Sequence, residues 1–315
     1  MSDRRMTARG HVSQAAVPDR DHGLGSVLVT GATGRVGSVI TAELSHRGHS
    51  VRAAVRRLGR QSASWPRFTT EVEFDFDRPS TIEAALDGVD RVFLIARPGD
   101  EEADRAARPL VAAMQRRHVR HVVNLTAMGV EALPDTGLRK VECAIEDSGV
   151  GFTHLRPNFF MQVFTAEPLL SAIRLRHVLA VPAGEARLSF VDARDVALVA
   201  SVALSEPGHV GRAYTLTGGK AISHHEVAEV IAIASGVPVR YVPIDDGVAR
   251  RVIVDSGLSE SRATRLLGFY AHVREGHCSP VSGDIERVLG CPATTFTAFA
   301  RDHREAWAPA PLVGT

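Results

Sequence analysis

A short β-branched segment that leads directly into three evenly spaced glycines constrains the fold of this chain more than any other feature. Residues 26–30 (Ser-Val-Leu-Val-Thr) have the composition of a buried strand, and Gly31, Gly34 and Gly37 follow at intervals of three. Apolar residues then recur with helical spacing from position 36 to 44, until Gly48. The pattern predicts a strand, a tight turn and a helix, which together begin a parallel α/β unit.

The position of the glycines also indicates what this turn can bind. Glycine allows the tight turn, lets backbone amides approach a phosphate and lets the helix pack closely on the sheet, while the amino end of the helix is positive. We therefore expect a dinucleotide pyrophosphate at this turn, although an ordinary glycine-rich strand–helix connection is the alternative. The expected contacts come from Gly31, Thr33, Gly34, Arg35, Val36 and Gly37.

The alternation of strands and helices continues after this unit. Further strands are predicted at 51–55, 72–76, 92–96, 121–125 and 151–155, with helices between them. This order predicts an α/β fold of the Rossmann type, with a doubly wound parallel sheet. The expected domains are a disordered lead-in (1–22), an NAD(P)-binding body (23–157) and a smaller mixed α/β substrate lobe (158–315), of which about 186–217 returns to the body.

The end of the second predicted strand indicates which dinucleotide is preferred. A carboxylate there would hold the ribose 2′-hydroxyl of NAD, but this chain has Arg56 and Arg57. Guanidinium groups pair with phosphate, so we expect NADP(H), with Arg35 as a second possible contact. Asp75 and Phe76, at the end of the third predicted strand, and Ala96, at the end of the fourth, complete the expected cofactor site.

Charge and composition exclude several other classes of partner. The 315 residues contain 37 Lys and Arg against 36 Asp and Glu, a net charge of +1, which does not favour binding to nucleic acid or to an anionic membrane. No apolar stretch approaches the roughly 18 residues of a membrane helix, and the first 20 residues lack the apolar core of a secretion signal. We expect a cytoplasmic protein with a small-molecule partner, for which an oligomer is possible. The 3 cysteines are far apart and the 14 histidines are scattered, so no metal site is expected.

Several segments in a fixed order resemble NmrA-like proteins, a group of atypical short-chain dehydrogenases/reductases. They are 29–37 (Val-Thr-Gly-Ala-Thr-Gly-Arg-Val-Gly), 75–77, 88–93, 148–161, 190–197 and 214–218, and the resemblance covers about residues 25–307. It implies a Rossmann fold and an NAD(P)H cofactor more firmly than it implies a reaction. The family includes NAD(P)H:quinone reductases and redox-sensing regulators.

Typical short-chain dehydrogenases donate a proton from a Tyr-x-x-x-Lys pair. This chain has two lysines, so the pair can be present at two places only. Thr136 precedes Lys140 by four positions and Leu216 precedes Lys220, so the pair is absent. Related isoflavone-reductase-like enzymes keep a single lysine in the helix after strand five. The matching position here is Leu138, with Lys140 two residues away, which makes Lys140 a weak candidate for catalysis and otherwise a surface cation.

Two polar residues near the expected strand ends are further candidates for catalysis. Thr126 follows strand five, where typical relatives keep a serine, and its hydroxyl would bond a substrate oxygen unless local backbone occupies it. Asn158 follows strand six, and its amide would bond the nicotinamide or a substrate carbonyl.

The sequence favours an NADPH-dependent reductase of a quinone or an enone-like aromatic molecule, because such acceptors need a positioned proton donor least. A non-catalytic NADP(H)-sensing regulator and a biosynthetic tailoring enzyme that acts on an aromatic intermediate are the alternatives.

Overall fold

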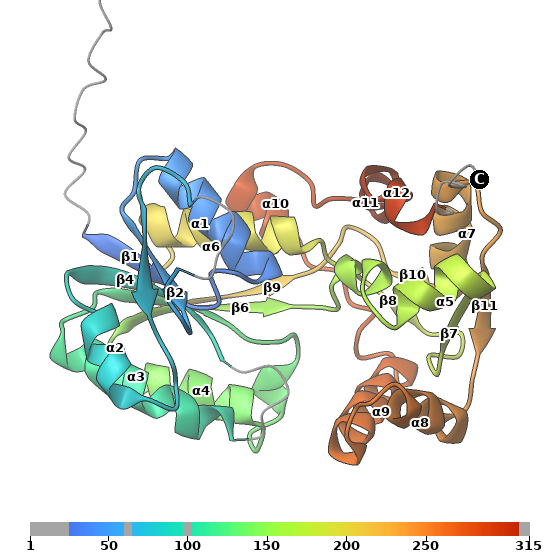
Figure 1. Ribbon diagram of the computed structural model, residues 1–315, viewed down its shortest axis with the longest axis horizontal. Coiled ribbons are helices and arrows are strands. Elements are labelled where there is room, and N and C mark those ends of the chain that lie inside the picture. Colours follow the sequence, from blue (N-terminus) through green and yellow to red (C-terminus); the bar gives the residue numbers. More distant parts are fainter. Residues whose placement is uncertain (1–24, 60–64, 97–101, 309–315) are drawn as a thin grey trace, which may run out of the picture.

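A seven-stranded parallel sheet forms the centre of the larger lobe (Figure 1). The computed structural model describes residues 25–59, 65–96 and 102–308. The strand order is β3-β2-β1-β4-β5-β6-β9, so the chain reverses direction across the sheet between β1 and β4. The strands are β1 (Ser26–Val29), β2 (Val51–Val55), β3 (Thr69–Glu73), β4 (Val89–Ile95), β5 (His121–Leu125), β6 (Gly151–Pro157) and β9 (Arg212–Leu216). This architecture confirms the predicted doubly wound Rossmann-type fold.

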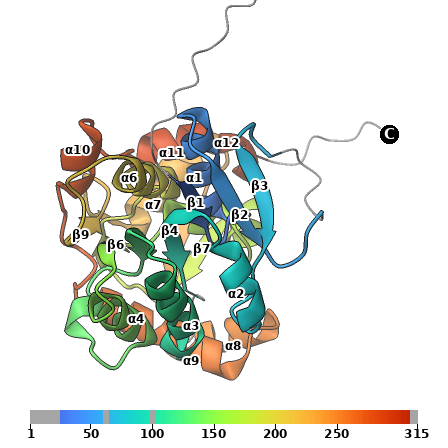
Figure 2. The same cartoon turned by 90° about the vertical axis from the view of Figure 1, so that its left-hand side faces the viewer.

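Helices cover both faces of this sheet, and Figure 2 shows the two helical layers on either side of it. One face carries α1 (Arg35–His46), α6 (Ala193–Ser205) and α10 (Asp284–Leu289), which enclose a core that includes Phe93. The other face carries α2 (Pro79–Ala85), α3 (Ala103–Arg116) and α4 (Gly137–Glu146) over a second core. Because both faces are covered, the central strands are apolar on both sides, as parallel sheets require.

The smaller lobe has a core of its own and two short sheets. Strand β7 (Val178–Val181) pairs in parallel with β11 (Arg240–Pro243), and β8 (Arg187–Leu188) pairs antiparallel with β10 (Ile222–Ser223). Large aromatic side chains fill the core, and the indole of Trp307 donates a hydrogen bond to the Phe164 carbonyl over 2.7 Å. The helical elements are η2 (Met161–Thr165), α5 (Leu169–Arg176), α7 (His224–Ser235), α8 (Asp246–Asp255), α9 (Glu260–Arg274), α11 (Phe296–Asp302) and α12 (Arg304–Trp307).

The two lobes share the chain instead of dividing it at one point. After entering the smaller lobe, the chain returns to the body as α6 and β9, and later again as α10. Strand β8 ends at Leu188, and beyond it Val191 forms only an isolated bridge with Phe160. The third strand is shifted, to Thr69–Glu73, so Asp75 and Phe76 lie in the turn that follows it.

The carboxyl ends of the sheet strands face the smaller lobe (Figure 1). In open α/β sheets, ligands bind outside these ends, where the strand order reverses. Here that point lies between β1 and β4, beside the glycine turn. Among the described helices, none is both long and apolar enough to cross a membrane.

Candidate cofactor and substrate site

The turn after β1 can be made only by glycine. Gly31 has φ +62°, and a Cβ there would lie 2.8 Å from a methyl carbon of Ile95 on the neighbouring strand. A Cβ on Gly37 would lie 2.2 Å from the Gly31 carbonyl oxygen, so α1 packs directly against the turn. Gly34 closes the turn by donating from its amide to the Gly31 carbonyl over 2.8 Å. The sequence spacing of these glycines therefore reflects a close approach of backbone to backbone.

The amino end of α1 leaves hydrogen-bond donors for a ligand. Its N-cap is Gly34, no side chain caps it, and its first turn contains no acidic residue. The first amides of a helix have no partner within the helix and carry partial positive charge. Thr33, Gly34 and Arg35 are exposed here, while Val36 and Gly37 are buried. These residues fit a dinucleotide pyrophosphate by their backbone donors and by the space that the missing Cβ atoms leave.

Arg56 and Arg57 follow β2 at the same edge of the sheet, and both are exposed. Within the ranges 25–59, 65–96 and 102–308, no side chain forms an ion pair or hydrogen bond with the guanidinium group of Arg56, Arg57 or Arg35. No acidic residue follows β2 directly, since the chain continues as Arg-Arg-Leu-Gly. The positive charge is therefore open to a phosphate group.

The other predicted cofactor residues lie in neighbouring turns at this edge. Asp75 accepts the amide of Asp77 over 3.1 Å, so its carboxylate orders the turn after β3. Phe76 packs edge-on against Phe74, with ring centroids 4.9 Å apart. Ala96 is buried at the end of β4 and directly precedes the undescribed residues 97–101. Their contact with the cofactor remains a prediction.

Thr126 joins a buried network of ionic and polar groups. Its hydroxyl donates to the carboxylate of Glu142 on α4 over 2.9 Å. The side chain of Glu142 is fully buried, and Arg156 on β6 donates to both of its oxygens, over 3.0 and 2.8 Å. Arg139 donates to the same carboxylate over 2.8 Å and also to Glu146.

These contacts set the charge of Glu142. Burial acts to raise the pKa of this carboxyl, but the hydrogen bond from Arg156, the nearby positive charge and the Thr126 hydroxyl outweigh it, so the pKa lies below its ordinary value. Glu142 is thus ionised at neutral pH and accepts hydrogen bonds only. While Thr126 gives its one proton to Glu142, it can accept a hydrogen bond from a substrate but cannot donate one.

Asn158 is also occupied by internal contacts. Its amide nitrogen donates to the Ser189 hydroxyl and to the Cys278 carbonyl, both over 2.8 Å, and its oxygen accepts the Phe159 amide over 2.9 Å. The residue is 5% exposed. In this arrangement Asn158 joins three segments of the chain where β6 leaves the body, and both of its donor hydrogens are used. Its predicted contact with nicotinamide or substrate would require these bonds to change.

Lys140 lies on the exposed side of α4. The structure therefore does not bring the three predicted catalytic residues into one hydrogen-bonded group. It connects Thr126 instead with Glu142 and Arg156, which the sequence reasoning missed. The signal was present, because Glu142 lies beside Val141 on the apolar face of a helix and Arg156 interrupts an apolar strand. Two opposite charges in such buried elements indicate an ion pair.

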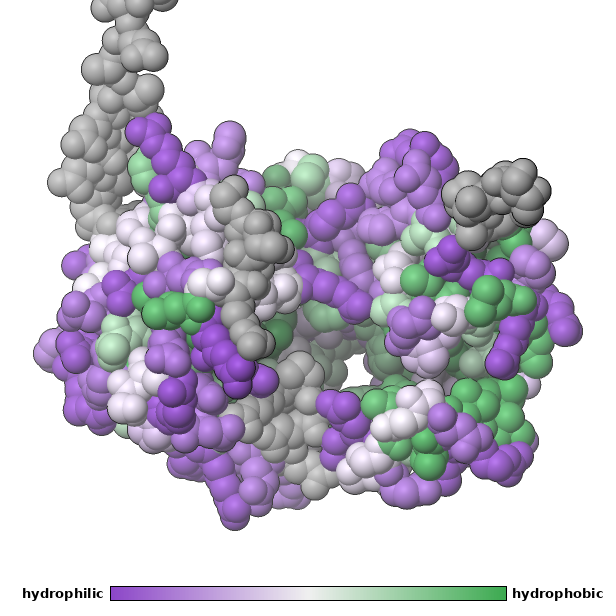
Figure 3. All heavy atoms as spheres, in the orientation of Figure 1, coloured by the Kyte–Doolittle hydropathy of each residue, from purple (hydrophilic) through white to green (hydrophobic). Residues whose placement is uncertain are grey.

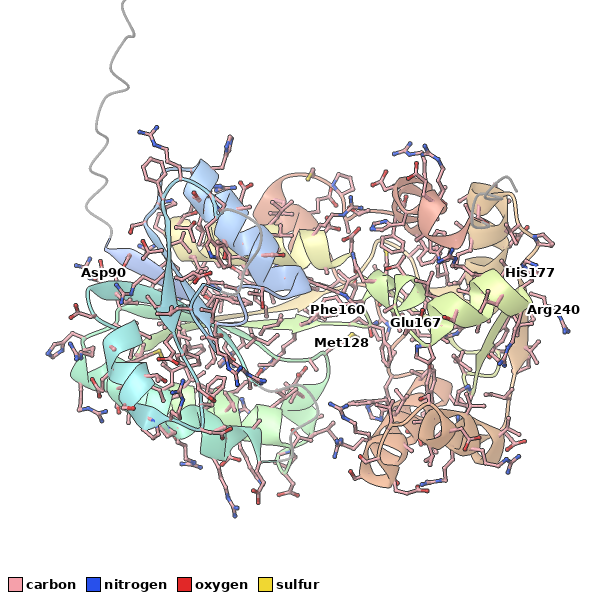
Figure 4. All side chains as sticks on the ribbon, in the orientation of Figure 1. Asp90, Met128, Phe160, Glu167, His177 and Arg240 are labelled. Atoms are coloured by element: carbon pink, nitrogen blue, oxygen red, sulfur yellow. The ribbon has the colours of Figure 1, made fainter. Side chains whose placement is uncertain are left out.

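The surface is hollowed between the two lobes, at the edge where the sheet strands end (Figure 3). Figure 4 places Met128 and Phe160 at this junction, one after β5 and one after β6. A different pocket of about 640 Å³ lies at the far side of the smaller lobe, lined by α7 and β11 residues together with His177. His177 and Arg240 mark that side in Figure 4, and no residue of the glycine turn lines this pocket. The junction between the lobes is therefore the candidate site.

Comparison with known proteins shows the family to which the chain belongs. Residues 31–207 match a family model described as NAD(P)H-binding. The chain is 33% identical to the NAD(P)H azoreductase of Xenophilus azovorans over 290 residues, which are 90% of this chain and all of the relative. It is also 33% identical to the (4-alkanoyl-5-oxo-2,5-dihydrofuran-3-yl)methyl phosphate reductase of Streptomyces griseus, over 90% of this chain and 99% of that protein.

A solved structure shows the same fold. The NADPH-dependent quinone oxidoreductase of Escherichia coli in complex with NADPH superposes with a TM-score of 0.78 at 22% identity, over 88% of this chain and 99% of that one. The resemblance inferred from the motifs is thereby confirmed. The chain belongs to the NAD(P)H-binding family, among the NmrA-like atypical short-chain dehydrogenases/reductases.

Proposed function

We propose that this protein is an NADPH-dependent reductase that transfers hydride to a conjugated small molecule, with quinones and enone-like aromatic compounds as the first candidates. The observation that carries the cofactor assignment is the uncapped amino end of α1 behind the Gly31 turn. Its backbone amides would hold the pyrophosphate, and Arg56, with Arg57 and Arg35, would hold the 2′-phosphate. The bound dinucleotide supplies the hydride.

The proton chemistry narrows the substrate class. A simple ketone needs a proton on its oxygen as hydride arrives, and positioned donors supply roughly 10²–10⁴ in rate for such steps. Thr126 gives its proton to Glu142, and Asn158 gives both amide hydrogens to protein acceptors. A conjugated acceptor spreads the new negative charge and can take its proton from solvent. The residues at the junction then act by orienting the acceptor and excluding water from its reacting face.

The relatives are consistent with this class. One is named as an azoreductase, one as a quinone oxidoreductase, and one as a reductase of a dihydrofuranone phosphate, whose ring holds a double bond conjugated to a carbonyl. Azo groups, quinones and conjugated carbonyls all accept hydride into a π system. We propose the same chemical class for this chain.

The test is loss of NADPH absorbance with a panel of a quinone, an azo dye, a cyclic enone and an unconjugated ketone. We expect turnover with at least one conjugated acceptor and none with the ketone. Turnover on the ketone alone would contradict the assignment.

A non-catalytic NADP(H) sensor is the second candidate, because occupied proton donors also suit a protein that only binds its cofactor. Tight NADPH binding without turnover on any acceptor would favour the sensor.

A further inference from the structure

Three potential metal ligands meet at the carboxyl end of α9, in the smaller lobe. One ligand atom from each of His272, Glu275 and His277 lies within 4.8 Å of the other two. A single carboxylate oxygen of Glu275 is 3.7 Å from Nδ1 of His272 and 3.4 Å from Nε2 of His277. The two imidazole rings lie with their centroids 4.2 Å apart. All three side chains are at least 41% exposed and thus open to an ion from solution.

These distances match the spacing of ligands around zinc. Zinc binds imidazole nitrogen and carboxylate oxygen at about 2.0–2.2 Å with tetrahedral angles, which separates two ligand atoms by about 3.4 Å. The Glu275–His277 separation has this value, and the Glu275–His272 separation exceeds it by an amount that a small side-chain rotation would remove. Two histidines and one glutamate are also a ligand set that zinc sites use, with the fourth position open.

The backbone holds this arrangement in place. Gly276 has φ +87°, and its amide donates to the Val273 carbonyl over 3.0 Å, while the His277 amide donates to the His272 carbonyl over 3.3 Å. This pair of bonds is a Schellman motif, in which the side chain two residues after the helix end meets the side chain of the last turn. That contact is commonly apolar, but here both positions are histidines and the residue at the helix end is a glutamate. The turn therefore presents three ligands without further folding.

The surrounding charges leave room for a cation. Arg274, the nearest basic residue in the sequence, is tied to Asp246 over 2.9 Å. A second group of potential ligands in the described part of the chain, Glu142, Glu146 and His154, has its carboxylates paired with Arg139 and Arg156. Guanidinium groups already fill the place of a cation there. Within the described part of the chain, Glu275 pairs with His272 and His277 and with no guanidinium group.

We propose that His272, Glu275 and His277 form a binding site for one divalent zinc-type ion, with solvent in the remaining position. This departs from the expectation of no metal, which rested on the scatter of histidines along the sequence. The site lies next to the segment that fastens the lobes, since the Cys278 carbonyl accepts hydrogen bonds from Asn158 and from the Ser189 amide. A bound ion would fix the end of α9 to that segment.

The experiment is calorimetric titration of ZnCl₂ into the chelator-treated full-length protein, with the variants His272→Ala, Glu275→Gln and His277→Ala. We expect one equivalent of zinc to bind, and each variant to lower the affinity by roughly tenfold or more. His225→Ala is the matched control, because His225 is an exposed histidine that faces only one carboxylate, that of Glu185 at 3.3 Å. Its titration should equal that of the unchanged protein.

A second measurement is the melting temperature with and without zinc. Because an ion that binds only the folded protein stabilises it, zinc should raise the melting temperature of the unchanged protein and of His225→Ala, but not of the three site variants. Either of two results would overturn the proposal: no heat of binding in the unchanged protein, or zinc affinity that survives all three substitutions. Neither measurement uses reductase activity, so the outcome is independent of the proposed function.

Discussion

Thr126 on the edge of the candidate site and Glu142 on α4 are joined by a hydrogen bond of 2.9 Å in which the threonine is the donor. The bond links Thr126, a predicted substrate contact, to a fully buried carboxylate, and through it to Arg156 and Arg139. Thr126 was expected to donate a hydrogen bond to a substrate oxygen. Because its proton goes to Glu142, the Thr126 hydroxyl can only accept a hydrogen bond from a substrate.

The first prediction concerns the stability that Glu142 contributes. Glu142→Gln keeps the shape of the side chain but removes the buried negative charge that Arg156 and Arg139 share, so we expect a loss of about 3 kcal/mol in the free energy of unfolding at pH 7. Urea denaturation checks this. The conservative control is Glu146→Gln. Glu146 is partly exposed and pairs with Arg139 but not with Arg156, so its substitution should lower the free energy of unfolding by less.

The stabilisation that Glu142 contributes depends on pH in a defined direction. The pKa of Glu142 is lower in the folded protein than in the unfolded chain, so its stabilisation is complete above the unfolded value of about 4.3 and is lost as the pH falls through the folded value. The difference in unfolding free energy between the unchanged protein and Glu142→Gln should therefore shrink below about pH 4.3. A difference that grew on acidification would contradict the assigned charge.

The second prediction separates a structural role of Asn158 from a catalytic one. Asn158→Ala removes two donors, and we expect a cost of about 1–3 kcal/mol in stability. If the residue acts only by fastening the segments, kcat/KM per folded molecule should stay nearly constant. A large fall in kcat/KM with little loss of stability would restore Asn158 as a residue that contacts substrate or cofactor.

The third prediction tests the close approach of α1 to its turn. In Gly37→Ala the new Cβ would lie 2.2 Å from a backbone oxygen, so the helix must shift, and we expect about 1–3 kcal/mol of destabilisation with weaker NADPH binding. Gly268→Ala on α9 is the control, because no heavy atom outside its own stretch of helix lies within 4 Å of its Cβ position. That change should raise stability by up to about 1 kcal/mol. Thermal melts with and without NADPH measure both effects.

The fourth prediction concerns the choice of cofactor. Arg56→Ala should lower the affinity for NADPH by about tenfold or more, since a hydrogen bond to a charged group contributes roughly 1.5–3 kcal/mol, and should leave NADH binding almost unchanged. Fluorescence titration with both nucleotides gives the ratio. An unchanged ratio in the double variant of Arg56 and Arg57 would place the 2′-phosphate elsewhere.

The fifth prediction uses His224, which is 2% exposed within the aromatic core of the smaller lobe. Burial lowers its pKa to about 4. Because the unfolded chain binds this proton at higher pH than the folded protein does, stability should fall as the pH drops from about 6.5 toward 4. His224→Phe should remove up to about 3 kcal/mol of that fall. The exposed His46→Gln is the control, and an equal acid sensitivity in His224→Phe would count against the assignment.

Local patterns were enough to predict the sheet and the glycine turn. The spacing of Gly31, Gly34 and Gly37 reflects the packing of the start of α1 against its own turn, which is local in the sequence, and strand periodicity indicates burial on both faces. The turn after β3 was harder to place, because apolar Phe74 and Phe76 continue the strand pattern beyond Glu73, while their side chains pack against each other.

Contacts between segments far apart in the sequence could not be predicted from local patterns. Asn158 was expected to face a ligand, but its partners Ser189 and Cys278 lie 31 and 120 positions away. Thr126 likewise meets Glu142 only because α4 folds back over β5 and β6. A polar residue at a strand end has the same sequence signature whether it meets a ligand or a remote part of its own chain, so the roles of such residues depend on tertiary structure.

The return of α6 and β9 to the larger lobe determines when this lobe can fold during synthesis. While the ribosome is synthesising the first 157 residues, β6 has no neighbour on its outer side and the apolar face of α1 has no helix against it. Residues 193–216 cover both, and they emerge only after the first part of the smaller lobe. The nucleotide-binding body can therefore complete its folding only after residues 193–216 have been synthesised. A fragment that stops at Pro157 should aggregate instead of folding.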